Sequence, residues 1–186
     1  MMMKLFRILQ VLGLLILSIP AQAEQVTAVT VDTQGKISTA TAVFSQGLSV
    51  DGKNFTATIN TSVAKSGLYF QATITLDDAD VGKTVDILLV VGRDTTAPYD
   101  GNDAIYTSVD SKNKATPVNL YATPDVWMAQ LTTPYKTGIT LQKTMTVKLG
   151  HRKLPIVGAY FAYVAYRTPD GAITYTTQPA VITITN

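Results

Sequence analysis

Hydrophobic and polar residues alternate along much of this chain, most clearly in the stretch LYFQATITL, residues 68–76. Leu68, Phe70 and Ile74 fall on one face of an extended strand, and the polar residues between them fall on the other. The pattern predicts a strand with one face in a core and the other in water. Similar runs predict further strands at Val26–Val31, Ile37–Phe44, Phe55–Ile59, Val85–Val91, Ala104–Val109, Thr144–Leu149, Ala159–Arg167, Ile173–Thr176 and Val181–Thr185.

The spacing of these runs predicts an all-β fold, a sandwich or a barrel, because turn sequences such as Asp51-Gly52 and Pro169-Asp170-Gly171 separate them. Val85–Val91 is almost continuously apolar, which indicates a central strand covered on both faces. From about residue 110 to 143 the alternation weakens and three Thr-Pro pairs occur. We expect a long excursion there, with one or two short edge strands, held to the body by Trp127 or Leu131.

Residues 1–23 have the features of a secretory signal peptide. Lys4 and Arg7 precede an apolar run from Ile8 to Ile19, and the small-residue triplet Ala21-Gln22-Ala23 follows. The alternative, a membrane anchor, needs about 20 apolar residues and this run is shorter. We therefore expect export to the periplasm, the cell surface or the medium, with no membrane insertion after cleavage.

The residues expected to remain after cleavage are close to neutral in charge. Removing Lys4 and Arg7 from the 15 basic residues leaves 13, against 13 acidic residues. Without a basic excess the chain lacks the phosphate-neutralising term that dominates nucleic-acid affinity, so we expect no nucleic-acid partner. The chain contains no cysteine, so its core alone must stabilise the fold.

A resemblance rests on several segments, chiefly Val85–Val91, Leu154–Tyr160 with Val164–Arg167, Asp170-Gly171 and Gln178-Pro179. Together they resemble an uncharacterised immunoglobulin-like β-sandwich module of exported and surface proteins of Gram-negative bacteria. The resemblance covers roughly residues 44–186, and the chain departs from it with Ala165 before the Tyr-Arg pair. It implies one antiparallel immunoglobulin-like sandwich over residues 37–186, preceded by an N-terminal strand or extension over residues 24–36. It implies no chemistry.

The stretch GAYFAYVAYR, residues 158–167, contains the candidate contact residues. Tyr160 and Val164 share one parity, which we assign to the core, so Phe161 and Tyr163 should face outward. With Arg167 and the lone Trp127 they are candidate contacts for a ligand or partner protein. The alternative is that the 110–143 excursion covers this row, or that it holds only cross-strand aromatic pairs.

Catalytic and metal chemistry have little support in the sequence. The single histidine, His151, lies between Gly150 and Arg152, which favours an exposed basic turn over a catalytic base. Asp100, Asn102 and Asp103 are weak calcium candidates, and turn formation through their side chains is the alternative. We expect no enzymatic activity, no cofactor and no bound metal.

Three functions remain after these exclusions. The leading hypothesis is an exported, non-enzymatic interaction module with an unknown protein or glycan partner. In the second, the chain is a subunit of a surface fibre that lends residues 25–31 to a neighbour's open sheet edge and so forms homo-oligomers; here the alternative is that this strand pairs within its own domain. In the third, aromatic side chains bind carbohydrate.

Overall fold

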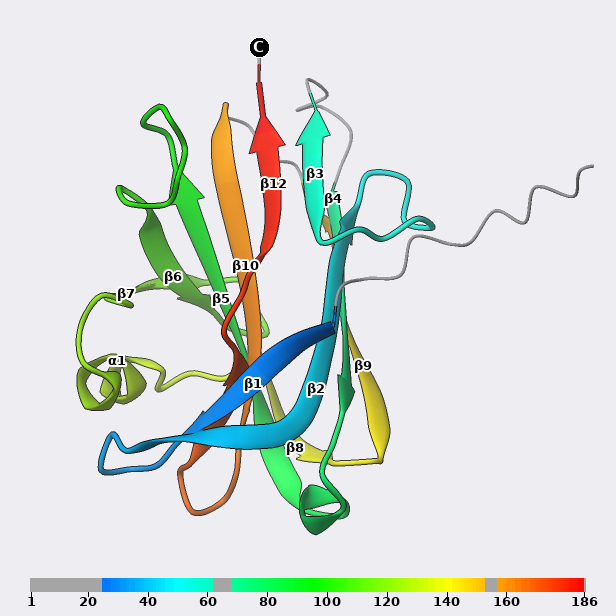
Figure 1. Ribbon diagram of the computed structural model, residues 1–186, viewed down its shortest axis with the longest axis vertical. Coiled ribbons are helices and arrows are strands. Elements are labelled where there is room, and N and C mark those ends of the chain that lie inside the picture. Colours follow the sequence, from blue (N-terminus) through cyan, green and yellow to red (C-terminus); the bar gives the residue numbers. More distant parts are fainter. Residues whose placement is uncertain (1–24, 62–67, 153–156, 186) are drawn as a thin grey trace, which may run out of the picture.

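The computed structural model describes residues 25–61, 68–152 and 157–185, so the expected signal peptide lies outside the described residues (Figure 1). The fold is all-β, as predicted, and the segments that are not strand include one short α-helix and one turn of 3-10 helix. No helix within the described residues is long and apolar enough to span a membrane. The strands are β1 (Gln25–Val31), β2 (Ile37–Ser49), β3 (Thr58–Thr61), β4 (Leu68–Thr75), β5 (Thr84–Asp94), β6 (Ile105–Val109), β7 (Ala115–Val118), β8 (Lys136–Thr140), β9 (Thr144–Arg152), β10 (Gly158–Arg167), β11 (Ile173–Thr176) and β12 (Ala180–Ile184), and the helices are η1 (Asp78–Asp80) and α1 (Pro124–Gln130).

The strands form one curled, mostly antiparallel sheet in the order β7-β6-β5-β10-β11-β1-β2-β4-β9. Three pairings lie off this path: β8 pairs with β5, β12 pairs with β10, and β12 also pairs in parallel with β3. The curl brings β1, β2, β4 and β9 opposite β5, β10 and β12, so the sheet forms two facing layers (Figure 1). β1 pairs with both β2 and β11 and makes the layers continuous.

The space between the two layers holds the main hydrophobic core. Phe70 and Ile74 of β4 meet Tyr160 and Val164 of β10 there, all of them buried, and Leu68 packs against the same cluster. This confirms the predicted core face of both strands. Alternation along each strand places every second side chain in this interior, which is why these residue types form these elements.

The excursion covers the outer face of β5 and β10 and creates a second core. It contains the two short edge strands that the sequence predicted, β7 and β8, and also α1, which it did not predict. Trp127 and Leu131 are both buried against the sheet, which confirms that this segment is held to the body there. Because β5 lies between the two cores, Ile87 faces one and Leu88 the other, as its continuous apolar sequence indicates.

Two local predictions were wrong. The backbone of His151 continues β9 and does not form a turn; β9 pairs with β4 as far as Arg152 after a register shift. The strand expected at Phe55–Ile59 begins later, as β3, where it can pair in parallel with β12.

Candidate functional site

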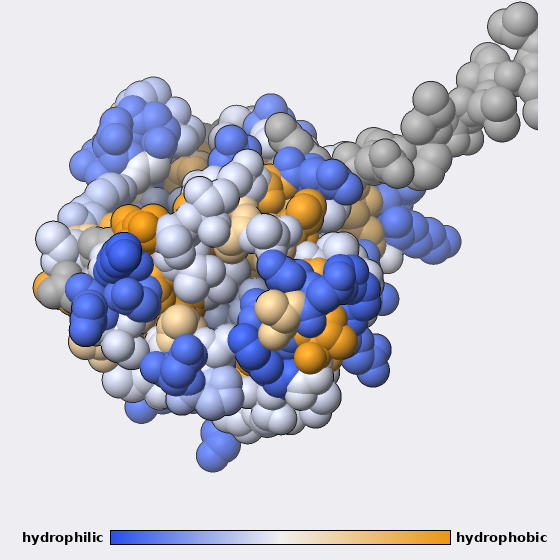
Figure 2. Space-filling model, turned by 60° about the horizontal axis from the view of Figure 1, so that its bottom comes forward, coloured by the Kyte–Doolittle hydropathy of each residue, from blue (hydrophilic) through white to orange (hydrophobic). Residues whose placement is uncertain are grey.

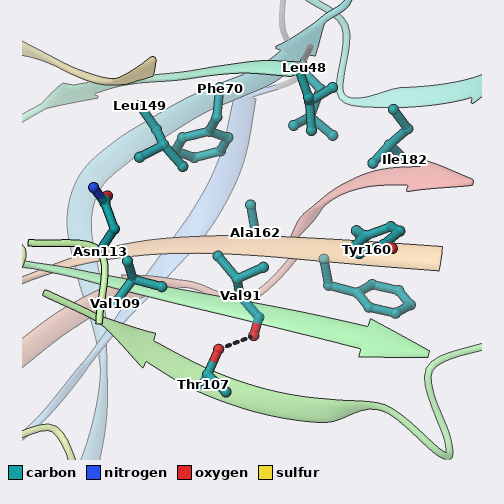
Figure 3. Close-up of a pocket in the computed structure, with 12 residues that line it drawn as sticks. Leu48, Phe70, Val91, Thr107, Val109, Asn113, Leu149, Tyr160, Ala162 and Ile182 are labelled. Atoms are coloured by element: carbon teal, nitrogen blue, oxygen red, sulfur yellow. Dashed lines mark hydrogen bonds between the residues drawn. The ribbon is translucent and has the colours of Figure 1, made fainter. Parts of the chain in front are cut away.

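An apolar hollow lies where the two ends of the curled sheet face each other. We call it the seam pocket, and its volume is about 250 Å³. In Figure 3, Leu48, Phe70 and Leu149 approach it from one layer and Val91, Ala162 and Ile182 from the other. Its lining residues are Leu48, Leu68, Phe70, Val91, Thr107, Val109, Asn113, Leu149, Tyr160, Phe161, Ala162 and Ile182.

Few polar groups reach the seam pocket. The hydroxyl of Thr107 donates to the carbonyl oxygen of Val91 over 3.2 Å and so is already engaged (Figure 3). Asn113 is exposed and belongs to the turn between β6 and β7. It has a φ of +64°, a left-handed conformation that asparagine tolerates better than most residues. The pocket therefore pairs a hydrocarbon interior with a polar mouth.

The structure corrects the predicted exposure of the aromatic row on β10. Phe161 points away from the main core, as its parity requires, but it is only 8% exposed because it packs in the second core. Tyr163 is half-buried beside the ring of Tyr106, at a centroid distance of 6.1 Å. Trp127 is buried as well. Both alternatives hold in part: the excursion lies beside Tyr163, and Tyr106 of β6 forms aromatic pairs with Phe161 and Tyr163.

Two of these candidates, Trp127 and Tyr163, line the same hollow, which we call the aromatic cleft. It has a volume of about 210 Å³ and lies between α1 and the outer face of the sheet. The rings of Trp127 and Tyr175 form an edge-to-face pair in it, with a centroid distance of 5.4 Å. The cleft is lined by Leu88, Val90, Leu120, Trp127, Leu131, Tyr163, Ala165, Tyr175 and Thr177.

Two polar groups of the aromatic cleft are available to a ligand. Among the described residues, neither the indole N–H of Trp127 nor the hydroxyl of Tyr175 has a hydrogen-bond partner in the protein. Neither of these two atoms is buried without a hydrogen-bond partner, so both are accessible to solvent. Burial raises the pKa of the Tyr175 hydroxyl, which therefore stays a neutral donor and acceptor at physiological pH.

Arg167, the fourth predicted contact residue, has a structural role at the edge of this region. Its Nη1 donates to the carbonyl oxygen of Leu131 over 2.9 Å, and its Nη2 donates to Asp86 Oδ2 over 2.8 Å. The guanidinium thus connects the excursion to β5. Because both terminal nitrogens of the guanidinium already donate hydrogen bonds within the protein, few donors remain for a ligand.

The calcium candidates are used in turns. Asp100 accepts hydrogen bonds from the backbone and the side-chain amide of Asn102, and Asp103 is exposed. Nearby Asp94 is fully buried and accepts from the backbone N–H groups of Thr96 and Gly101, each over 2.9 Å. No three acidic, histidine or cysteine side chains of the described residues come together as a metal site.

A third hollow, at the end of the molecule that carries η1, is polar. Figure 2 brings this end forward and shows mostly hydrophilic side chains around small hydrophobic areas. Asp77 and Asp80 line the hollow, but Asp77 accepts from Thr41, and Asp80 accepts from Tyr166 and pairs with Lys83 over 2.6 Å. The bond from Thr41, followed by that from the Ala79 N–H, lowers the pKa of Asp77. These carboxylates serve the fold.

The two apolar hollows differ in how far their lining residues could be predicted from the sequence. Tyr163 was found as a candidate by its outward parity, and Trp127 because it is the single tryptophan of the sequence. The seam pocket was missed, because its lining consists of ordinary core residues from seven strands and one turn. Leu149, at the end of a predicted strand, gave no signal of its own.

Comparisons with known proteins identify no family for this chain. No protein-family model and no curated protein sequence matches this chain. Among the solved structures that it resembles is the C-terminal domain of Wzt, with 8% sequence identity over 79% of this chain and 75% of that chain and a TM-score of 0.44. A likeness at this level carries no conclusion about a ligand or a partner.

Proposed function

We propose that this chain is an exported, non-enzymatic binding module of the immunoglobulin-like sandwich type, which holds an apolar group of its ligand in the seam pocket. The observation that carries the proposal is the pocket itself, an apolar hollow between two layers that opens at the ends of the sheet. Sites for whole small molecules usually measure about 300–1,000 Å³. A volume of about 250 Å³ suits one aliphatic or aromatic group of a larger ligand.

The chemistry of the lining supports binding without catalysis. Among the described lining residues there is no carboxylate or imidazole that would act as a general base. The one aliphatic hydroxyl, that of Thr107, is bonded to the backbone. Export is supported by the features of residues 1–23.

The proposal is tested by filling the seam pocket and measuring the fluorescence of bound 1-N-phenylnaphthylamine. Ala162 lies on the pocket floor, so Ala162→Leu should occupy the space and weaken dye binding at least tenfold. Ala115→Leu is the matched control, because Ala115 is exposed on β7 and outside the pocket. Equal dye binding by the two variants, both folded by circular dichroism, would contradict the proposal.

A second candidate function is carbohydrate binding in the aromatic cleft. Trp127 and Tyr175 favour it, since they offer two unpaired polar groups above an apolar floor. Trp127 is the only tryptophan, so its emission reports directly on the cleft. Sugars that bind there should shift the emission, and Tyr175→Phe should weaken that binding about tenfold, the loss of one hydrogen bond. Emission unmoved by a panel of hexoses would remove this candidate.

A further inference from the structure

Strand β9 has one side without a partner strand. Within the described residues it pairs only with β4 and stands at the end of the sheet order. The N–H of Leu76 donates to the carbonyl of Lys143, and antiparallel pairs alternate from there, so Met145, Val147 and Leu149 bond to β4. The backbone groups of Thr144, Thr146 and Lys148 therefore point to the open side, where the carbonyl oxygen of Lys148 accepts one long, exposed bond of 3.4 Å from the hydroxyl of Tyr135.

The open side of β9 borders the seam pocket. Leu149 lines the pocket from β9, and Val109 and Asn113 line it from the opposite end of the sheet. A strand added beside β9 would alternate as β9 does, with every second side chain directed inward. One of its inward side chains would then enter the pocket. Strand addition of this kind takes affinity from backbone hydrogen bonds and specificity from side-chain pockets.

The residues next to the pocket mouth are basic. Lys112 and Lys114 flank Asn113, and Lys148 precedes Leu149; all three lysines are exposed, and none forms an ion pair with a described residue. The nearest carboxylate, Asp110, accepts from the backbone N–H groups of Lys112 and Lys114, each over 2.8 Å. In a nearly neutral chain this local excess of positive charge favours an acidic partner.

We propose that β9 accepts an extended, acidic segment of a partner protein as an added strand, with one apolar side chain of that segment in the seam pocket. The inference rests on the proposed function, because the pocket must bind an apolar group. A second copy of this chain fits poorly as the occupant, since β9 itself contains no acidic residue to meet Lys148. The partner's acidic side chains lie on the Lys148 face and its apolar side chains on the Leu149 face.

The test uses a fluorescein-labelled peptide of about nine residues in which aspartate alternates with leucine, with binding followed by fluorescence anisotropy. Only one alternate set of peptide amides faces β9. We expect N-methylation of one set to weaken binding at least tenfold and N-methylation of the other set less than threefold. Equal effects of the two sets would overturn strand addition.

A backbone variant of the protein makes the same distinction. Lys148→Pro removes an N–H that points away from β4, a position where an edge strand tolerates proline. It should weaken peptide binding at least tenfold, well beyond the effect of Lys148→Ala, and leave binding of 1-N-phenylnaphthylamine unchanged. Dye binding without peptide binding would overturn this inference and leave the proposed function standing. Absence of dye binding would overturn both.

Discussion

At the scale of single residues, Gly158 fixes the start of β10. Its φ of +145° is a conformation that other residues rarely adopt, and a Cβ atom there would lie 2.3 Å from the carbonyl oxygen of Asp94. Asp94 in turn holds the loop that follows β5 through its buried carboxylate. The close approach of two backbones at this point places Tyr160 and Phe161 on their respective faces.

We expect Gly158→Ala to lower the free energy of unfolding by at least about 3 kcal/mol, because it adds a clash with backbone to the strain of a positive φ. Gly82→Ala is the control, since Gly82 also has a positive φ, +87°, but has no atom within 4 Å of the added carbon. Its cost should be strain alone, about 1–2 kcal/mol. Urea denaturation measures both values, and similar losses would show that the contact with Asp94 is relaxed.

At the scale of elements, the excursion shows why α1 was not predicted. The helix has only seven residues, begins at the proline of the Thr123-Pro124 pair, and lies in a segment rich in turn formers. A helix this short is not stable alone, so packing of Trp127 and Leu131 against the sheet must stabilise it. The sequence predicted one or two short edge strands in this segment without their positions, and the structure contains two, β7 and β8.

Truncation of a side chain in this segment tests its contribution to stability. Leu131 is 2% exposed, so Leu131→Ala should leave a cavity and lower the free energy of unfolding by about 2–5 kcal/mol. Val126 on α1 is 44% exposed, and Val126→Ala should change the free energy of unfolding by less than about 0.5 kcal/mol. A small effect of Leu131→Ala would mean that the excursion unfolds independently of the sheet.

At the scale of the whole molecule, the pairings decide which strands are free to accept a partner: within the described residues, β3, β7, β8 and β9 each pair with one strand only. β1 lies between β2 and β11, and Ala28 and Val31 are fully buried, so the N-terminal strand pairs within its own domain. The alternative in which this strand is lent to a neighbour would have to break both ladders. Of these edges, β9 borders the seam pocket, and a strand added there would replace only the bond from the Tyr135 hydroxyl to the carbonyl oxygen of Lys148 among the contacts described.

Buried tyrosines make the whole fold sensitive to alkali. Burial raises the pKa of Tyr106, Tyr163, Tyr166 and Tyr175 above the ordinary value of 10.0. Above pH 10.0 the unfolded chain loses these protons before the folded chain does, so the free energy of unfolding is retained below that pH and falls as the pH rises further. Urea denaturation from about pH 8 to about pH 11.5 measures the decline. Tyr106→Phe should make it shallower, and a constant free energy across the range would contradict the expectation.

The sequence by itself determined the strands and their core faces, because alternation is a local property that a residue and its neighbours decide. Phe70, Ile74 and Val164 were assigned to the interior on that basis, and they lie there. The continuous apolar run in β5 also predicted that both faces of this strand would be covered. β10 is the neighbour of β5 in the sheet, so its outer face also meets the second core, and Phe161 is buried there. The sequence does not show which strands are neighbours, so it did not predict the burial of Phe161.

Only the tertiary structure decided where the two ends of the sheet meet. The seam pocket joins Leu149 to Val109 and Asn113, and the aromatic cleft joins Trp127 to Tyr175 across a similar gap in the sequence. Both depend on which distant strands become neighbours and on how far the sheet curls. Many weak contacts along the whole chain set these features, so no short stretch of sequence encodes either hollow.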